Sequence, residues 1–301
     1  MIEIVFLGTS SMFPTKERNH TSIYLRYEGE RMLFDCGEGT QRQMRIAGIS
    51  GVKIKRIFIS HWHGDHALGL GGIIQSLSAS KRREMLEIYG PDDTQKRVKS
   101  LLNAFSFYRN FEISCHDINV ADLQEIYVAE RFKILAFPLL HLIPCLGFVF
   151  QENSRRKIKV EYTKKYGLVQ HPIMKKLQAG EDIVWKGKLI RAEDATYIVK
   201  GKKICYIPDT KYFDKLTEYC KDADLIICEA CYSKKDSELA QEYYHLTAEE
   251  AAKIAKEAGA KKLILFHFSQ RYADPKVLLE EARQVFKEVE LAYDFMKVEL
   301  K

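Results

Sequence analysis

Hydrophobic and polar positions alternate along the first third of the chain with the two-residue period of β-strands. The runs IEIVFLGTS, TSIYLRY, EGERMLFDCGEG and IKRIFISH follow this pattern, and Gly and Ser residues mark the turns between them. Strand patterns continue in LEIYGP, FKILAFPLLH and GFVFQEN, and they return near the C-terminus in KKICYIPDT, ADLIICEACY and AKKLILFHFS. The pattern therefore predicts one group of strands in each half of the chain.

Helical patterns lie between and after these strands. GTQRQMRIAGI predicts a short helix closed by Gly48, and GLGGIIQSLSASKRR predicts another. TAEEAAKIAKEAG begins with Thr247 and Glu250 in the spacing of a capping box, and DPKVLLEEARQVFKEV places Pro275 at an early helical position behind Asp274. Strand groups with intervening helices in two halves predict an α/β (α+β) fold of four layers, αββα, in a single domain over residues 1–301.

Residues 151–203 interrupt this alternation. The segment has little continuous apolar pattern and contains the chain breakers Gly167, Pro172, Gly180 and Gly187. It carries 14 Lys/Arg and 6 Asp/Glu, a net charge of +8, which leaves −2 for the rest of a chain whose total is +6. We therefore expect residues 151–203 to form an inserted basic arm that favours an acidic partner.

Bulk composition narrows the class of protein. Hydrophobic residues make up 46% and charged residues 29% of the 301 positions, which is ordinary for a folded protein with a large core. No apolar run approaches the ~20 residues of a membrane helix, and MIEIVFLGTSS lacks the basic start of a signal peptide. Seven cysteines at irregular spacing favour a reducing compartment over a disulfide framework. We expect a cytoplasmic protein without a membrane partner.

The stretch ISHWHGDH places four metal-binding side chains within six residues, at the end of a predicted strand. His61 and His63 are two positions apart, so their side chains can meet one ion, and Gly64 lets the backbone turn before Asp65 and His66 face a second. A single His-x-His is a weak signal, but His-x-His-x-Asp-His at a strand end is a strong one. This cluster predicts a site for two metal ions.

Two ions need further ligands, and one carboxylate can bridge them. His141, Asp209 and His267 each end a predicted strand, at the kind of position where α/β folds present functional residues. Each alone is more often a structural residue, but three matching positions favour ligands. His245 precedes a helix, where a solvated histidine is common, and His20, His116 and His171 are expected at the surface. Cys228 and Cys231, a lone C-x-x-C, are interpreted as buried thiols.

SHWHGDH, together with the strand-end His141, Asp209 and His267, resembles the metallo-β-lactamase superfamily. Within it the chain is similar to the ribonuclease Z family of tRNA 3′-processing endonucleases over essentially its whole length. GTSSMFPTKERN matches that family's Pro-x-Lys-x-Arg-Asn loop through Pro14, Lys16, Arg18 and Asn19. FDCGEGTQRQ, EACYSKKDSELAQEYYHLTAEEAA and FHFSQRY match three further segments of the family.

The resemblance implies a metallo-β-lactamase sandwich with a protruding arm and two Zn²⁺ per subunit. In that pattern His61, His63 and His141 bind one zinc, Asp65, His66 and His267 bind the other, and Asp209 bridges them. Asp65 is also implied to accept a proton, and His245, assisted by Glu229, to protonate the leaving 3′-oxygen or hold the scissile phosphate. Asp35 is interpreted either as a carboxylate that orients a ligand histidine or as an ordinary turn cap.

The implied reaction removes the 3′ trailer from precursor tRNA, leaving a 3′-hydroxyl on the tRNA and a 5′-phosphate on the trailer. The arm is implied to grip the tRNA body, often for the other subunit of a homodimer, through lysines such as Lys164, Lys165, Lys175 and Lys176. It departs from many relatives in reading YGLVQHPIMKKL in place of a Gly-Pro-rich centre.

Two alternatives remain open. Another hydrolase of the same fold, such as a thioesterase or a small phosphodiesterase, would share the metals but would not need PTKERN, the basic arm or His245. A non-catalytic RNA-binding scaffold would keep the arm but not all seven metal-binding residues.

Overall fold

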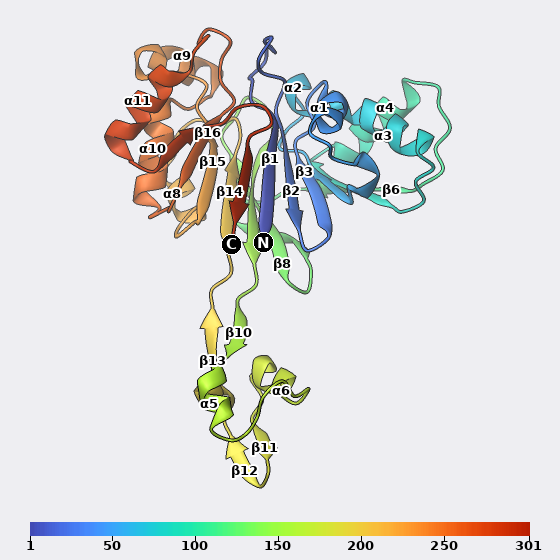
Figure 1. Cartoon of the computed structure of the whole chain (residues 1–301). Coiled ribbons are helices and arrows are strands. Elements are labelled where there is room, and N and C mark those ends of the chain that lie inside the picture. The colour runs from blue at the N-terminus through green and yellow to red at the C-terminus, as the bar shows by residue number, and fades with distance from the viewer.

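Two seven-stranded sheets pack face to face in the computed structural model, which describes residues 1–301 (Figure 1). The first sheet has, from edge to edge, β18 (Lys297–Leu300), β1 (Ile2–Gly8), β2 (Ser22–Tyr27), β3 (Glu30–Phe34), β4 (Arg56–Phe58), β5 (Leu86–Pro91) and β6 (Ile113–Ile118). The second has β17 (Val289–Leu291), β16 (Leu263–Phe266), β15 (Leu225–Glu229), β14 (Lys203–Ile207), β9 (Cys145–Glu152), β8 (Phe132–Leu139) and β7 (Gln124–Val128).

Each sheet combines antiparallel and parallel pairs. Strands β3 to β6 are parallel in the first sheet, as are β14 to β17 in the second. These parallel strands are buried along nearly their whole length where both faces are covered, as in β15 and β16. Consequently the loops that follow β4, β14, β15 and β16 emerge at the carboxyl ends of parallel strands, where side chains for chemistry are commonly placed.

Helices cover the outer face of each sheet (Figure 1). The first sheet carries α1 (Thr40–Ile46), α2 (Gly64–Ala67), α3 (Gly69–Ala79) and α4 (Thr94–Asn103), with the 3₁₀ turn η1 (Gly51–Lys53). The second carries α8 (Lys215–Tyr219), α9 (Ser237–Tyr243), α10 (Ala248–Glu257) and α11 (Lys276–Val285), with η2 (Lys234–Asp236). The capping box of Thr247 and Glu250 is present at the start of α10.

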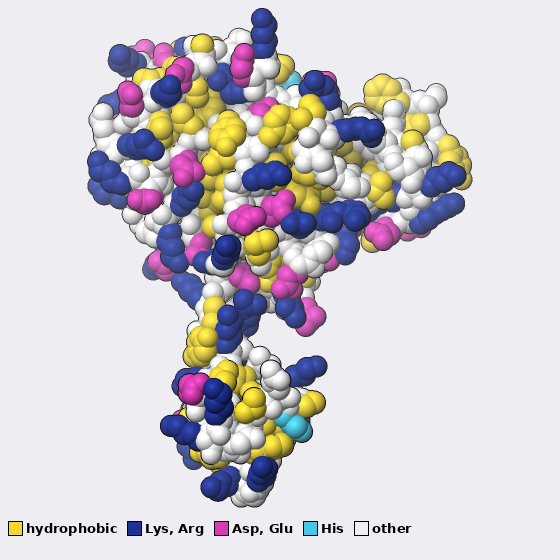
Figure 2. Space-filling model, viewed as in Figure 1, with side chains coloured by type: hydrophobic (Ala, Val, Ile, Leu, Met, Phe, Trp, Pro, Cys, Tyr) yellow, Lys and Arg dark blue, Asp and Glu magenta, His cyan; other side chains and the backbone are white.

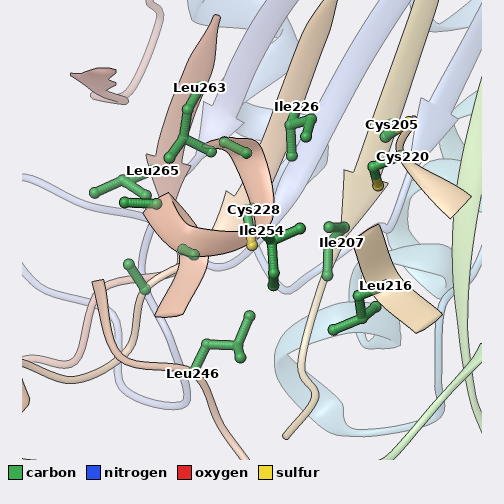
Figure 3. Close-up of a cluster of buried hydrophobic side chains, with 14 of the residues drawn as sticks. Cys205, Ile207, Leu216, Cys220, Ile226, Cys228, Leu246, Ile254, Leu263 and Leu265 are labelled. Carbon is green, nitrogen blue, oxygen red and sulfur yellow. The ribbon is translucent and has the colours of Figure 1, made fainter. Parts of the chain in front are cut away.

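Three hydrophobic clusters hold these layers together. One lies between the sheets and includes Phe34 and Phe58, whose stacked rings are 5.2 Å apart. A second lies between the first sheet and α1, α3 and α4. The third joins the second sheet to α8, α10 and α11 through side chains such as Ile226, Ile254 and Leu265 (Figure 3). The predicted four-layer αββα fold is confirmed.

The sequence pattern did not predict several elements of the fold. Helix α4 and strands β6 and β7 were not predicted, because their outer positions are half-exposed and the apolar period is weak. The predicted strand FKILAFPLLH ends at Leu139, two residues before His141. None of the helices combines the length and the apolar content that crossing a bilayer requires.

The chain between β9 and β14 leaves the body and forms a separate lobe below the sheets (Figure 1). This arm contains β10 (Arg155–Ile158), α5 (Val160–Lys164), α6 (Met174–Ala179), β11 (Ile183–Trp185), β12 (Lys188–Ile190), α7 (Ala192–Ala195) and β13 (Thr196–Val199). Six buried side chains form its own small core, around Leu168, Leu177 and Ile190. Among the charged side chains on its visible face, Lys and Arg far outnumber Asp and Glu (Figure 2).

Candidate metal centre

The turn after β4 presents the histidine cluster. His61 and His63 lie in the extended segment after the strand, and the four-residue helix α2 carries Asp65 and His66. The first turn of this helix is closed by a hydrogen bond from the His66 backbone N–H to the His63 carbonyl oxygen (3.2 Å). The change from extended to helical backbone at Gly64 points the two halves of the motif in different directions.

Residues from three other loops meet this turn and complete two groups of possible metal ligands. In each group, one nitrogen or oxygen from every member lies within 4.8 Å of the others. The groups are His61, His63, His141 and Asp209, and Asp65, His66, Asp209 and His267.

Asp209 belongs to both groups and divides its two oxygens between them. Its Oδ2 lies 3.6 Å from His61 Nε2 and 3.8 Å from His141 Nε2. Its Oδ1 lies 3.0 Å from His267 Nε2 and 3.4 Å from His66 Nε2. This is the arrangement in which one carboxylate can bridge two cations.

The residues present fit a pair of divalent cations. Asp65 Oδ1, His66 Nε2, Asp209 Oδ1 and His267 Nε2 are buried and have no hydrogen-bond partner within the protein. Leaving such atoms without a partner costs about 1–3 kcal/mol each, so a ligand is the expected compensation. Imidazole nitrogens and carboxylate oxygens suit Zn²⁺, and also Mn²⁺ or Fe²⁺.

The nitrogen atoms that face away from the centre are held by other groups. His66 Nδ1 lies 2.8 Å from Asp35 Oδ2, and His267 Nδ1 lies 2.8 Å from Thr21 Oγ1. His141 Nδ1 lies 3.1 Å from the backbone oxygen of Tyr244. Such partners fix the orientation of each imidazole ring. Of the two interpretations of Asp35, the structure favours the carboxylate that orients a ligand histidine.

Burial and mutual charge set the protonation of the centre. Burial lowers the pKa of His61 well below its usual value and lowers that of His141 to about 4. Burial of Asp209 would raise its pKa, but the nearby His267 and His66 hold it well below the usual value. His61 and His141 are therefore neutral and Asp209 is ionised near neutral pH, which are the forms that bind metal.

His245 stands beside the two groups and pairs with Glu229. Its Nδ1 lies 3.0 Å from Glu229 Oε1, and its Nε2 lies 4.0 Å from Asp209 Oδ2. Glu229 is fully buried and also accepts the backbone N–H of Thr210 (2.9 Å). Burial alone would lower the pKa of His245, but Glu229 and Asp209 raise it to about 9.

A cavity of about 600 Å³ opens over the centre. Its floor includes His63, Asp65, Asp209 and His245, and its rim carries exposed apolar side chains from Met12, Phe13 and Leu142 together with Arg271. A volume of this size accommodates a small ligand or part of a polymer. The centre is thus open to a substrate on one side and enclosed by the sheets on the other.

The loop that was predicted to bind substrate divides into two parts. Pro14 and Lys16 are exposed, and they follow Phe13, which lines the cavity. Arg18 is buried, and its guanidinium donates to the backbone oxygen of Tyr272 (2.9 Å), so its own contacts fix the shape of the loop. Asn19 donates its amide to the backbone oxygen of Glu38 (2.8 Å).

The remaining predicted residues lie elsewhere. Lys164, Lys165, Lys175 and Lys176 are exposed on the arm, far from the metal centre (Figure 1). The expectation that His20 lies at the surface is wrong, because its ring is buried and its Nε2 lies 3.1 Å from the Met12 backbone oxygen.

The relatives found by sequence comparison share the name ribonuclease Z. The chain is 41% identical to a ribonuclease Z of Methanothermobacter thermautotrophicus, covering 100% of this chain and 97% of that one. It is 42% identical to a ribonuclease Z of Pyrococcus abyssi, with the same coverage. The chain belongs to the ribonuclease Z family. Residues 2–289 also match the model of the family described as Anti-Pycsar protein Apyc1, so the chain belongs to that family of sequences too.

Comparison with solved structures shows that the similarity extends over the whole fold. Human tRNase Z, short form, superposes with a TM-score of 0.73 at 28% identity and covers 99% of both chains. The metallo-β-lactamase fold protein YhfI from Bacillus subtilis gives a TM-score of 0.70 at 19% identity, also over 99% of this chain. The predicted resemblance to ribonuclease Z and the metallo-β-lactamase fold is confirmed, and members of the ribonuclease Z family are metal-dependent hydrolases.

Sequence analysis did not identify several residues that lie around the centre. Thr21 and Tyr206 hold His267 and Asp35, and the thiol of Cys145 lies 3.6 Å from His61 Nδ1. These contacts join positions far apart in the chain, and none of them belongs to a local motif. Only Ser60, whose Oγ lies 3.0 Å from His61 Nδ1, was adjacent to the histidine cluster in sequence.

Proposed function

We propose that this protein is an endoribonuclease that removes the 3′ trailer from precursor tRNA in the cytoplasm, leaving a 3′-hydroxyl on the tRNA and a 5′-phosphate on the trailer. The observation that carries the proposal is the pair of ligand groups sharing Asp209, with His245 beside them in the floor of the same cavity. Membership in the ribonuclease Z family, whose relatives include the human tRNase Z structure, supports tRNA as the substrate.

The ligand assignment follows the two groups. His61, His63 and His141 would hold one Zn²⁺, Asp65, His66 and His267 would hold the other, and Asp209 would bridge them. When bound, two such ions supply Lewis-acid polarisation of the phosphodiester and a nucleophile at neutral pH.

The side chains then have separate tasks in an in-line displacement at phosphorus. Asp65 has a buried Oδ1 without a partner, and this atom would accept the proton of the attacking water. His245, held by Glu229 and charged near neutral pH, would donate a proton to the leaving 3′-oxygen of the tRNA. Glu229 makes no contact with the substrate in this proposal and acts by positioning His245.

The arm would bind the body of the tRNA through its lysines, including Lys164, Lys165, Lys175 and Lys176. Strand β9 begins at Cys145, next to the metal centre, and reaches the root of the arm at Glu152. At about 3.3 Å per residue, the strand separates the two by roughly 23 Å, and the arm continues away from the centre (Figure 1). An arm pointing away from its own cavity serves a tRNA bound to another copy, which supports a homodimer.

The loop with Pro14 and Lys16 would contact the tRNA end at the rim of the cavity. Arg18 and Asn19 would contribute by holding that loop against Tyr272 and Glu38.

The deciding experiment is cleavage of a tRNA precursor with a 3′ trailer by metal-loaded protein, with both product ends mapped, beside His63→Ala. We expect one cut close to the discriminator nucleotide, with the stated end groups, and none with the variant. Two bound metals and hydrolysis of a thioester or a small phosphodiester, without any cut in the precursor, would overturn the proposal.

A further inference from the structure

A second cavity of about 570 Å³ borders the metal centre on the other side of His63. It lies between the histidine turn and α4, and its walls include Trp62, Leu68, Lys96 and Arg97. His63 lines both this cavity and the one above the metal centre, so the two cavities share a proposed metal ligand as a wall residue. Its volume is within the range of about 300–1,000 Å³ typical of ligand sites.

The walls of the second cavity combine an aromatic ring with cations. The Trp62 indole is half-buried, and its N–H donates to Thr94 Oγ1 (3.0 Å), which fixes the plane of the ring. The Arg97 guanidinium lies 5.8 Å from the centre of that ring. The Lys96 side chain is 80% exposed, and Asp93, the one carboxylate that lines the cavity, is 4.0 Å away. An aromatic ring beside exposed cations is a common surface for single-stranded nucleic acid.

The position of the leaving group indicates which part of the substrate lies near this cavity. His245 lines the first cavity, so the leaving 3′-oxygen, and with it the tRNA, lies there. The phosphate stays with the trailer, whose 5′-oxygen is not in line with the leaving oxygen. The trailer therefore extends to the side of the scissile phosphate, and the second cavity is a concave surface that shares His63 with the cavity over the centre.

We propose that the cavity of Trp62, Leu68, Lys96 and Arg97 binds the first nucleotides of the 3′ trailer. A base stacks on the Trp62 indole against Leu68, and Lys96 and Arg97 neutralise the backbone phosphates. This inference rests on the proposed function and adds the binding site of the product that leaves with the 5′-phosphate.

The chain contains two tryptophans, Trp62 at this cavity and Trp185 in the arm, which makes a direct binding test possible. In Trp185→Phe, Trp62 is the only indole, and a 5′-phosphorylated trinucleotide should quench its fluorescence saturably. In Trp62→Phe, which keeps only Trp185, the same trinucleotide should leave the emission unchanged. No change in Trp62 emission in a protein that still cleaves precursor would overturn the site.

Trailer length gives a second test that does not depend on the overall integrity of a variant. In Trp62→Leu, kcat/KM for a precursor with a three-nucleotide trailer should fall roughly 5- to 160-fold, the range that corresponds to loss of one stacked base. It should fall much less for a precursor with a single trailer nucleotide. An equal fall for both precursors would show a general disturbance of the neighbouring histidines and would contradict the proposal.

Charge reversal on α4 supplies a matched pair of variants. Arg97→Glu should weaken binding of the trinucleotide and reduce the slope of log affinity against log salt by about 0.7 for one lost phosphate contact. Lys99→Glu makes the same charge change on the same helix, but Lys99 lines a different cavity, so binding should be unchanged. Equal effects of the two variants would indicate that binding depends on the overall electrostatic potential of this surface and not on a contact at Arg97.

These outcomes separate the inference from the proposed function. Quenching of Trp62 by the trinucleotide without cleavage of any precursor would keep the nucleotide site and overturn the tRNA reaction. Cleavage of the precursor without quenching of Trp62 would keep the tRNA reaction and overturn the nucleotide site.

Discussion

Asp35 Oδ2 lies 2.8 Å from His66 Nδ1, and this contact places a carboxylate directly behind a proposed metal ligand. The same oxygen accepts hydrogen bonds from the Tyr206 hydroxyl (2.6 Å) and the Ser60 hydroxyl (2.8 Å). The backbone at Asp35 is left-handed, with φ of 58°, and the side chain is fully buried. The fold therefore holds this carboxylate in a demanding conformation so that it faces His66.

Replacing Asp35 by Asn should weaken metal binding at the group of Asp65, His66 and His267. The loss should be about 10- to 100-fold, as is usual when a partner behind a ligand histidine is removed. Competition with a coloured chelator measures the affinity of each site. Tyr206→Phe removes one donor to Asp35 without touching the histidine and should have a smaller effect. Unchanged affinity in Asp35→Asn would refute the role.

Replacing Asp65 by Ala should abolish cleavage and leave precursor tRNA binding nearly intact. The side chain is buried in the metal centre, whereas most of the proposed tRNA contacts lie on the arm. Gel-shift titration and a cleavage assay on the same preparation measure the two properties. Loss of both to the same extent would count against a catalytic role.

Glu229→Gln and His245→Ala should not have additive effects on kcat, because Glu229 acts through His245. Each single variant should lower kcat, and the double variant should be little worse than His245→Ala. Single-turnover kinetics of all four proteins measure this coupling. If the two losses multiply in the double variant, Glu229 has a task of its own.

Charge reversal of Lys175 and Lys176 should weaken tRNA binding and reduce its salt dependence. Each phosphate contact to a nucleic acid contributes a slope of the order of 0.7–0.9 in log affinity against log salt. Hydrolysis of a small phosphodiester reports on the metal centre alone, so the loss for the tRNA precursor should be at least tenfold larger. A similar loss for both substrates would place the effect outside the arm.

Asp294 should make the free energy of unfolding depend on pH. Burial raises the pKa of its carboxyl to about 6, although Thr9 and the Asn19 backbone donate to it. A raised pKa means that the folded protein binds this proton more tightly than the unfolded chain. Its stabilisation is thus complete below about pH 4 and is lost as the pH rises through 6, a change of the order of 3 kcal/mol.

Denaturant unfolding at pH 4.5 and pH 7.5 tests this prediction. Relative to Asp294→Asn, the wild type should lose stability between the two values. The exposed Asp92 offers a control, since Asp92→Asn should follow the wild type. Parallel pH profiles for the wild type and Asp294→Asn would contradict it.

The sequence predicted the features of this protein that depend on residues close together in the chain. His61 to His66 could be recognised because four ligand types share one turn, and the strand-end positions of His141, Asp209 and His267 follow from the strand pattern. Thr21, Tyr206 and Cys145 could not be found in this way, because their contacts depend on how two sheets pack. Arg18 shows the opposite case, since its motif position suggests a substrate contact whereas its guanidinium is bound to the backbone oxygen of Tyr272.

The arm also differed from the expectation in one respect. Its breakers and charges predicted an excursion from the body, but the apolar residues Leu168, Leu177 and Ile190 are too widely spaced in sequence to reveal a core. They come together only after α5, α6 and the β11–β12 hairpin fold against one another.

The small core of the arm shares no side chain with the hydrophobic clusters of the body. The arm and the body are joined only by the two chain segments that leave β9 and enter β14. Changes inside the arm can therefore accumulate without disturbing the packing that shapes the metal centre. In evolutionary terms the arm is an exchangeable module, free to follow the shape of the RNA that we propose it binds, while the body keeps its side-chain arrangement constant.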